Sequence, residues 1–351
     1  MIKSLQSVRF LMAMLIFHHH FYTNPQVVQF GVFPVAFFFM LSGFLMGVGY
    51  ADRVSSPEFS FRQFMRRRLI RIMPLNVTGL IFTMLVTAAI GIVRFNPRLG
   101  VGWMLIPDLF LFQSWIPIER VYFSGNAVAW FLSDMLFCYM MFPFICKILR
   151  RSMKPCIIVL VLYFIAVSHI PEHRVHAFVY ISPAFRVVDF MLGVCLYVYF
   201  SKCRSCIHRI QELSALNRTV IEALPFAFAV LSLAVYPYVP TRFSYASLYW
   251  IPSAVFIFVF AVMAGNGGGI SRMLGITPLR YLGNLSFAFY IFHLTIVRLY
   301  NTIEAHFATA PAGRSVAGAF VCIIMTVVAA CLYNRYIEPF ILKRINVNQQ
   351  Q

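Results

Sequence analysis

Long apolar segments recur along the whole chain, and they restrict its fold more than any other feature of the sequence. Each is about 18 to 24 residues long, enough for a helix to cross roughly 30 Å of hydrocarbon. The composition agrees, because 61% of the 351 residues are hydrophobic and only 11% are charged. We therefore expect an all-α membrane protein. The ten predicted spanning helices are residues 4–22, 28–50, 73–94, 127–146, 155–170, 181–200, 220–238, 246–264, 281–300 and 315–335.

The positions of Lys and Arg predict the topology. If residues 102–116 form a re-entrant stretch that enters the bilayer and returns, most of the 29 Lys and Arg lie in segments on one side, which marks that side as cytoplasmic. Both termini are then cytoplasmic. The formal charge of +18 is spread over short loops, so we expect a lipid bilayer and no nucleic acid as partner. We expect one integral-membrane domain, residues 1–344, and a short polar tail, residues 345–351.

Ionisable side chains at membrane depth are candidates for function, because they are costly there unless they face protein or water. Arg9 and His20 are eleven positions apart on the first helix, so they point the same way with about 16 Å between them along the axis. The alternative is that each reaches toward its nearer interface. Adjacent residues of the run His18, His19, His20 diverge by about 100° and cannot converge on one ion, so we expect no metal there.

The loop before the third predicted helix is rich in arginine. Arg67, Arg68 and Arg71 are near its end, and Arg68 and Arg71 share a helix face. Guanidinium groups bind phosphate in a bidentate manner, so this cluster could hold a phosphate-bearing donor. Topology and contact with anionic lipid headgroups explain the same residues equally well.

Further polar residues occur inside later predicted helices. Asp134 lies in the fourth, and His293 follows Tyr290 in the ninth. Arg186 and Asp189 are three positions apart in the sixth, and they can neutralise one another. Such an intramembrane pair is more often structural than catalytic.

Together these segments resemble the acyltransferase-3 family of bacterial multi-pass membrane acyltransferases. The family pattern of Arg, ten residues and His corresponds to Arg9 and His20, and its R-x-x-R before a proline corresponds to Arg68, Arg71 and Pro74. The stretch from Phe37 to Leu45, which includes Ser42, and the stretch from Leu282 to His293 are also similar to the family. In one departure, Met135 occupies the position where many members have a carboxylate.

The resemblance implies an O-acyltransferase of the bacterial inner membrane that moves acetyl from acetyl-CoA to a hydroxyl of an envelope or secreted glycan. His20 is the expected general base and Arg9 the residue that steadies the donor or a developing charge. Arg67, Arg68 and Arg71 are expected to hold the donor. Ser42, Asp134 and His293 are expected in the substrate pocket.

The alternative function is a multi-pass transporter or flippase of a glycan intermediate, because buried charges and a re-entrant stretch also occur in transporters. The pairing of Arg9 with His20 and the R-x-x-R motif favour the enzyme. The identity of the acceptor, the choice between acetyl and succinyl, and the oligomeric state all stay open.

Overall fold

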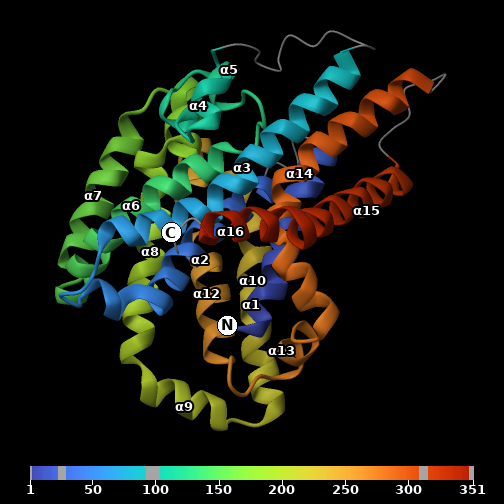
Figure 1. The fold of residues 1–351 in the computed structure, drawn as a ribbon. Coiled ribbons are helices and arrows are strands. Elements are labelled where there is room, and N and C mark those ends of the chain that lie inside the picture. Colours follow the sequence, from blue (N-terminus) through green and yellow to red (C-terminus); the bar gives the residue numbers. More distant parts are fainter. Residues whose placement is uncertain (1, 23–28, 92–102, 308–314, 348–351) are drawn as a thin grey trace.

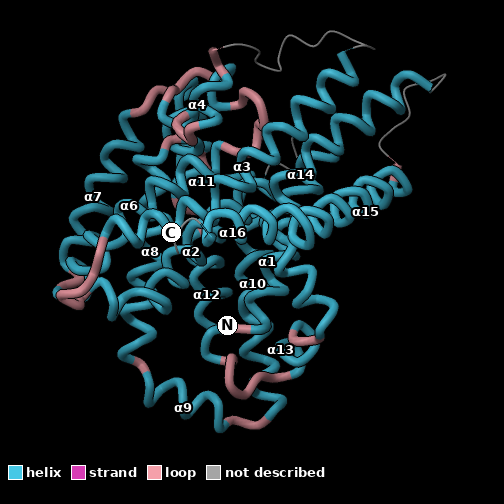
Figure 2. Tube along the Cα trace, in the orientation of Figure 1, coloured by secondary structure: helices cyan, strands magenta, loops and turns pink. Residues whose placement is uncertain are grey.

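The computed structural model describes residues 2–22, 29–91, 103–307 and 315–347. These residues form helices and contain no strand, which confirms the all-α prediction (Figures 1 and 2). The long helices are α1 (Lys3–Tyr22), α2 (Gln29–Val54), α3 (Phe61–Gly91), α6 (Trp130–Arg151), α7 (Lys154–His169), α8 (Pro183–Lys202), α10 (Ala215–Val235), α12 (Trp250–Val262), α14 (Thr277–Phe307) and α15 (Val316–Leu332).

Shorter helices connect or extend them. They are α4 (Leu105–Leu109), α5 (Glu119–Tyr122), α9 (Arg204–Glu212), α11 (Thr241–Ala246), α13 (Gly269–Leu274) and α16 (Glu338–Val347). The 3-10 helices are η2 (Gln113–Trp115), η3 (Glu172–Arg174) and η5 (Tyr236–Tyr238), and the π helices are η4 (His176–Ile181) and η6 (Tyr333–Ile337). Helix α16 continues past residue 344, where we predicted the domain to end. Residues 348–351 of the predicted tail lie outside the described residues.

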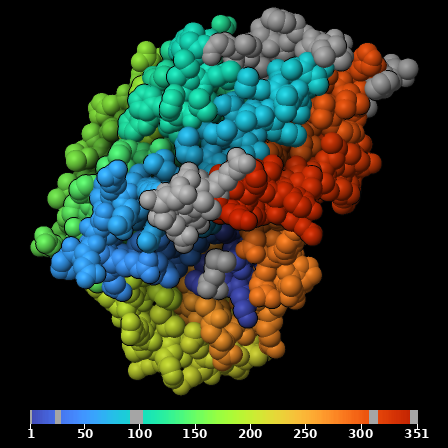
Figure 3. Space-filling model, in the orientation of Figure 1, coloured from blue at the N-terminus to red at the C-terminus, as the bar shows by residue number. Residues whose placement is uncertain are grey.

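Within the described residues, eight helices are long and apolar enough to cross a membrane, or nine if the bent pair of Lys154–His169 and Glu172–Ile181 forms one span. The chain is therefore a multi-pass membrane protein, although ten crossings were predicted. Two predicted spans account for the difference. One is α7, which reaches spanning length only together with the bent segment that follows it, and the other is α1, which carries Arg9 and three histidines. This helix lies inside the bundle, where its polar residues meet protein: the Gln6 amide donates to Asn284, and the Ser7 hydroxyl donates to the Leu274 carbonyl. On the face shown in Figure 3, α1 (dark blue) is almost covered by other helices.

The predicted re-entrant stretch at 102–116 forms only the short helices α4 and η2 in its described part, so it does not cross as one helix. Its organising residue is Asp108, which is fully buried. The carboxylate accepts hydrogen bonds from the backbone N–H of Asn126 (3.1 Å) and the amide of Gln113 (3.1 Å). The Asn126 amide in turn donates to the carbonyl of Ile291 on α14 (2.9 Å). This chain of contacts ties the α4 segment to the helix that carries His293.

Glycines allow the central helices to approach closely. A Cβ atom at Gly43 of α2 would lie within 3.0 Å of the Phe190 carbonyl oxygen on α8, and one at Gly193 of α8 would lie equally close to that of Met40. Gly283 of α14 has the same relationship with the carbonyl oxygen of Gln6 on α1. Close backbone packing at these glycines thus stabilises the contacts of α2 with α8 and of α1 with α14.

Short connecting helices lie at both ends of the bundle. Helices α9 and α13 lie at one end in Figure 1, and α4 and α5 lie at the opposite end. The segments that contain α9 and α13 were predicted on one side of the membrane, and those that contain α4 and α5 on the other, which agrees with this arrangement.

Candidate active site

Two histidines from distant parts of the sequence meet inside the bundle. Nδ1 of His20, near the end of α1, lies 2.9 Å from Nε2 of His293 on α14. Nδ1 of His293 lies 2.6 Å from the carbonyl oxygen of Tyr290, one turn earlier on the same helix. His293 is fully buried. The structure therefore places the predicted pocket residue His293 directly behind the predicted base His20.

The hydrogen bonds determine which nitrogen of each neutral imidazole carries its proton. A carbonyl oxygen only accepts, so Nδ1 of His293 donates to Tyr290. Nε2 of a neutral His293 is then an acceptor, and Nδ1 of His20 must donate to it. The remaining nitrogen of His20, Nε2, keeps its lone pair. That nitrogen is the one suited to accept a proton from a substrate.

His20 lines a cavity of about 410 Å³ between α1, α2, α6, η4 and α14. Much of its wall is aromatic, with Phe123, Trp130, Tyr180 and Tyr290. Pockets with apolar and aromatic walls and a few convergent polar groups are typical binding sites for small molecules. Ser42 and Asp134 do not line this cavity.

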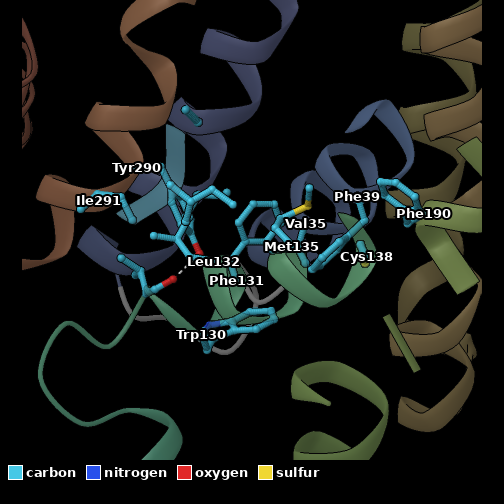
Figure 4. Packing of buried hydrophobic residues seen from close by; sticks show 14 of the residues in the cluster. Val35, Phe39, Trp130, Phe131, Leu132, Met135, Cys138, Phe190, Tyr290 and Ile291 are labelled. Atoms are coloured by element: carbon cyan, nitrogen blue, oxygen red, sulfur yellow. Dashed lines mark hydrogen bonds between the residues drawn. The ribbon is translucent and has the colours of Figure 1, made fainter. Parts of the chain in front are cut away.

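Aromatic packing holds Tyr290, the residue whose carbonyl oxygen accepts the hydrogen bond from His293. The Tyr290 hydroxyl donates to the Val128 carbonyl (2.9 Å), as the dashed line in Figure 4 shows. The ring of Tyr290 packs against Phe131 at 5.5 Å, and Phe131 packs against Phe39 at 4.6 Å, centroid to centroid. Met135 lies in the same apolar cluster (Figure 4). The position at which the family resemblance predicts a carboxylate is therefore part of the apolar packing in this chain.

Arg9 belongs to a second cluster, away from the His20 cavity. It interacts electrostatically with Arg71 of α3 and Tyr139 of α6. The guanidinium of Arg68 lies over the rings of Tyr50 (4.8 Å) and Tyr139 (5.7 Å) and donates to the Tyr50 hydroxyl. Within the described residues none of the three arginines forms an ion pair with a carboxylate. The structure therefore joins the two predicted arginine motifs and separates Arg9 from His20.

Arg67 lies near this arginine cluster, on the exposed side of α3. It lines a separate cavity of about 270 Å³ together with Arg53 and the aromatic residues Tyr50, Phe59 and Phe64. Arg68 also contacts Tyr50, so this aromatic residue connects the cavity to the arginine cluster. Arginine side chains thus extend from Arg9 to the mouth of the bundle near the start of α3, where Glu58 also lines the cavity.

The remaining predicted pocket residues have other surroundings. Asp134 is fully buried on α6 beside Ser114, close enough to Arg186 and Asp189 of α8 to interact with them electrostatically. Those two residues form a buried ion pair at 2.7 Å, and the Trp250 indole also donates to Asp189. Ser42 is half-buried on α2.

Sequence reasoning overlooked two charged residues. Arg298 lines the His20 cavity from α14, and its spacing from Leu294 and Asn301, which also line the cavity, would have indicated a shared helix face. Glu222 is fully buried on α10, where it accepts backbone N–H bonds from Gly268, Ile270 and Ser271 at the start of α13. This interaction with a helix N-terminus explains a carboxylate inside an apolar helix.

The chain is similar over most of its length to proteins that transfer acyl groups. A family model described as an acyltransferase domain matches residues 2–335. An acyltransferase of Streptomyces mycarofaciens, MdmB, is 27% identical over 329 residues, which cover 85% of this chain and 79% of that protein. No solved structure matches the chain.

Proposed function

Because the chain belongs to the acyltransferase-3 family, and is thus a multi-pass membrane acyltransferase, we propose that it transfers acetyl or a similar short acyl group from acyl-CoA to a hydroxyl of a cell-envelope or secreted glycan. We place it in the bacterial inner membrane with both termini in the cytoplasm. The observation that carries this proposal is the imidazole of His20, oriented by His293 and open to an aromatic cavity.

In the proposed reaction, Nε2 of His20 takes the proton of the acceptor hydroxyl as its oxygen attacks the thioester carbonyl. The tetrahedral intermediate then collapses, the C–S bond breaks, and the CoA thiolate receives the proton from the His20 imidazolium. His293 holds the ring of His20 and stabilises its protonated form through the shared hydrogen bond. General-base assistance of this kind contributes roughly 100- to 10,000-fold to the rate.

The donor is proposed to bind with its phosphates at Arg9, Arg68 and Arg71, and with its nucleotide end toward Arg67. Three guanidinium groups without carboxylate partners in the described residues match the several negative charges of CoA. Arg9 is about 16 Å from His20 along the helix axis. The pantetheine arm, which separates the CoA phosphates from the thioester, would span this interval.

The test is acetyl transfer by the purified protein in lipid vesicles, with acetyl-CoA as donor, together with the acetyl content of surface polysaccharide in cells. His20→Ala is expected to lower both by roughly 100-fold or more at unchanged protein abundance. His18→Ala is the matched control, because His18 is on the same helix but lines a different cavity beside α15. Equal activity of wild type and His20→Ala would refute the proposed role of His20.

A further inference from the structure

Arg298 contributes a positive charge to the wall of the His20 cavity. It is the one Lys or Arg among the described residues that line this cavity. It lies five positions after His293 on α14, and Leu294 and Asn301 of the same helix line the cavity with it. Its charge acts on both His20 and His293, so it is near the reacting end of the site.

The guanidinium of Arg298 has no carboxylate partner within the described part of the chain. The ion pairs formed there involve other residues, and the carboxylate six positions along, Glu304, accepts from the Tyr300 hydroxyl at 3.2 Å. A cation on a helix inside a membrane protein is costly unless an anion or water compensates it. Arg298 is therefore available to a ligand in the cavity.

The other groups around the cavity indicate how much negative charge the ligand carries. Apart from the imidazoles, the polar groups that line the cavity with Arg298 are neutral, namely the amide of Asn301 and the tyrosine hydroxyls, and the rest of the wall is aliphatic or aromatic. One guanidinium matches one carboxylate, which it can bind through two parallel hydrogen bonds. The multiply charged phosphates of CoA are better matched by the separate cluster of Arg9, Arg68 and Arg71.

We propose that Arg298, with Asn301, forms a carboxylate-binding subsite in the His20 cavity. The carboxylate belongs either to an acidic sugar of the acceptor or to a dicarboxylic acyl group such as succinyl on the donor. The inference deepens the proposed function, on which it rests for the identity of the two substrates. In both cases Arg298 orients a substrate relative to Nε2 of His20 and takes no part in the proton transfer.

The experiment measures binding, so it does not depend on turnover. The full chain in lipid nanodiscs is titrated with two matched pairs that differ by one carboxylate: methyl glucuronide against methyl glucoside, and succinyl-CoA against acetyl-CoA. Wild type is expected to bind the carboxylate member of one pair at least about tenfold more tightly, since a charge-assisted hydrogen bond contributes about 1.5–3 kcal/mol. The pair that shows the preference identifies the source of the carboxylate.

Arg298→Gln is expected to remove this preference and Arg298→Lys to retain part of it, while both keep wild-type affinity for acetyl-CoA as evidence of folding. Arg280→Gln, the same change on the same helix but outside the cavity, should leave the preference intact. The subsite is disproved if neither pair shows a preference in wild type, or if the preference survives Arg298→Gln. Failure of acetyl transfer alongside a preference lost in Arg298→Gln would instead count against the proposed function and leave the subsite standing.

Discussion

Nε2 of His293 lies 2.9 Å from Nδ1 of His20, so the proposed base is oriented by a residue 273 positions away in the sequence. The two imidazoles are expected to act as a unit. His20→Ala should lower kcat by roughly 100- to 10,000-fold, and His293→Ala by a smaller factor, because His293 acts only through His20.

The double variant tests this dependence. Its rate of acetyl-CoA consumption should equal that of His20→Ala alone, since groups that act together are not additive. Effects that multiply in the double variant would show that His293 contributes independently. The membrane abundance of each variant is measured by immunoblot as the control.

Arg68→Gln and Arg71→Gln are each expected to raise KM for acetyl-CoA by about tenfold or more, since each removes a charge-assisted contact to phosphate. Acetyl-pantetheine, which lacks the nucleotide, should show no such change. Arg66→Gln, an exposed neighbour on α3, is the control. If all three substitutions have the same effect with both donors, the basic segment serves topology or lipid contact and not the donor.

Gly193→Ala is expected to destabilise the bundle, because the added Cβ would lie within 3.0 Å of the Met40 carbonyl oxygen and a backbone atom cannot rotate away. The loss should be about 1–3 kcal/mol or more. Gly49→Ala on α2 is the matched control, since nothing lies within 4 Å of its added Cβ. Fluorescence-detected gel filtration after heating measures both. Equal melting temperatures for the two variants would contradict the close α2–α8 contact.

Asp108 should make the stability of the α4 segment depend on pH. Burial raises the pKa of its carboxyl from 3.8 to about 7, against the opposing effect of the Asn126 N–H bond. The folded state therefore keeps a proton that the unfolded chain releases between about pH 4 and 7. The free energy of unfolding should fall as pH rises through this window, by roughly 2 kcal/mol between pH 5 and 8.

Asp108→Asn cannot ionise, so this part of the pH dependence should disappear in that variant even if the protein is less stable overall. Thermal unfolding in detergent at a series of pH values measures it. A wild-type protein whose stability rises between pH 5 and 8 relative to Asp108→Asn would show that the buried carboxylate is stabilised in its charged form.

Apolar segment length determined the fold class, because only a helix satisfies its own backbone hydrogen bonds in hydrocarbon. Helical periodicity also placed Arg9 and His20 on one face of α1, and the resemblance to the acyltransferase-3 family identified the chemistry. These inferences depend on spacing within single segments or on matched motifs. They needed no knowledge of how the helices pack.

Tertiary structure alone decided which residues share a site. Periodicity relates positions on one helix, but it does not give the rotation of one helix against its neighbour. Three relationships depend on that rotation: the contact of His20 with His293, the proximity of Arg9 to Arg71, and the position of Arg298 in the wall of the His20 cavity. The glycine contact between α1 and α14 helps to set it, because Gly283 lets the two backbones approach closely enough for the imidazoles to meet.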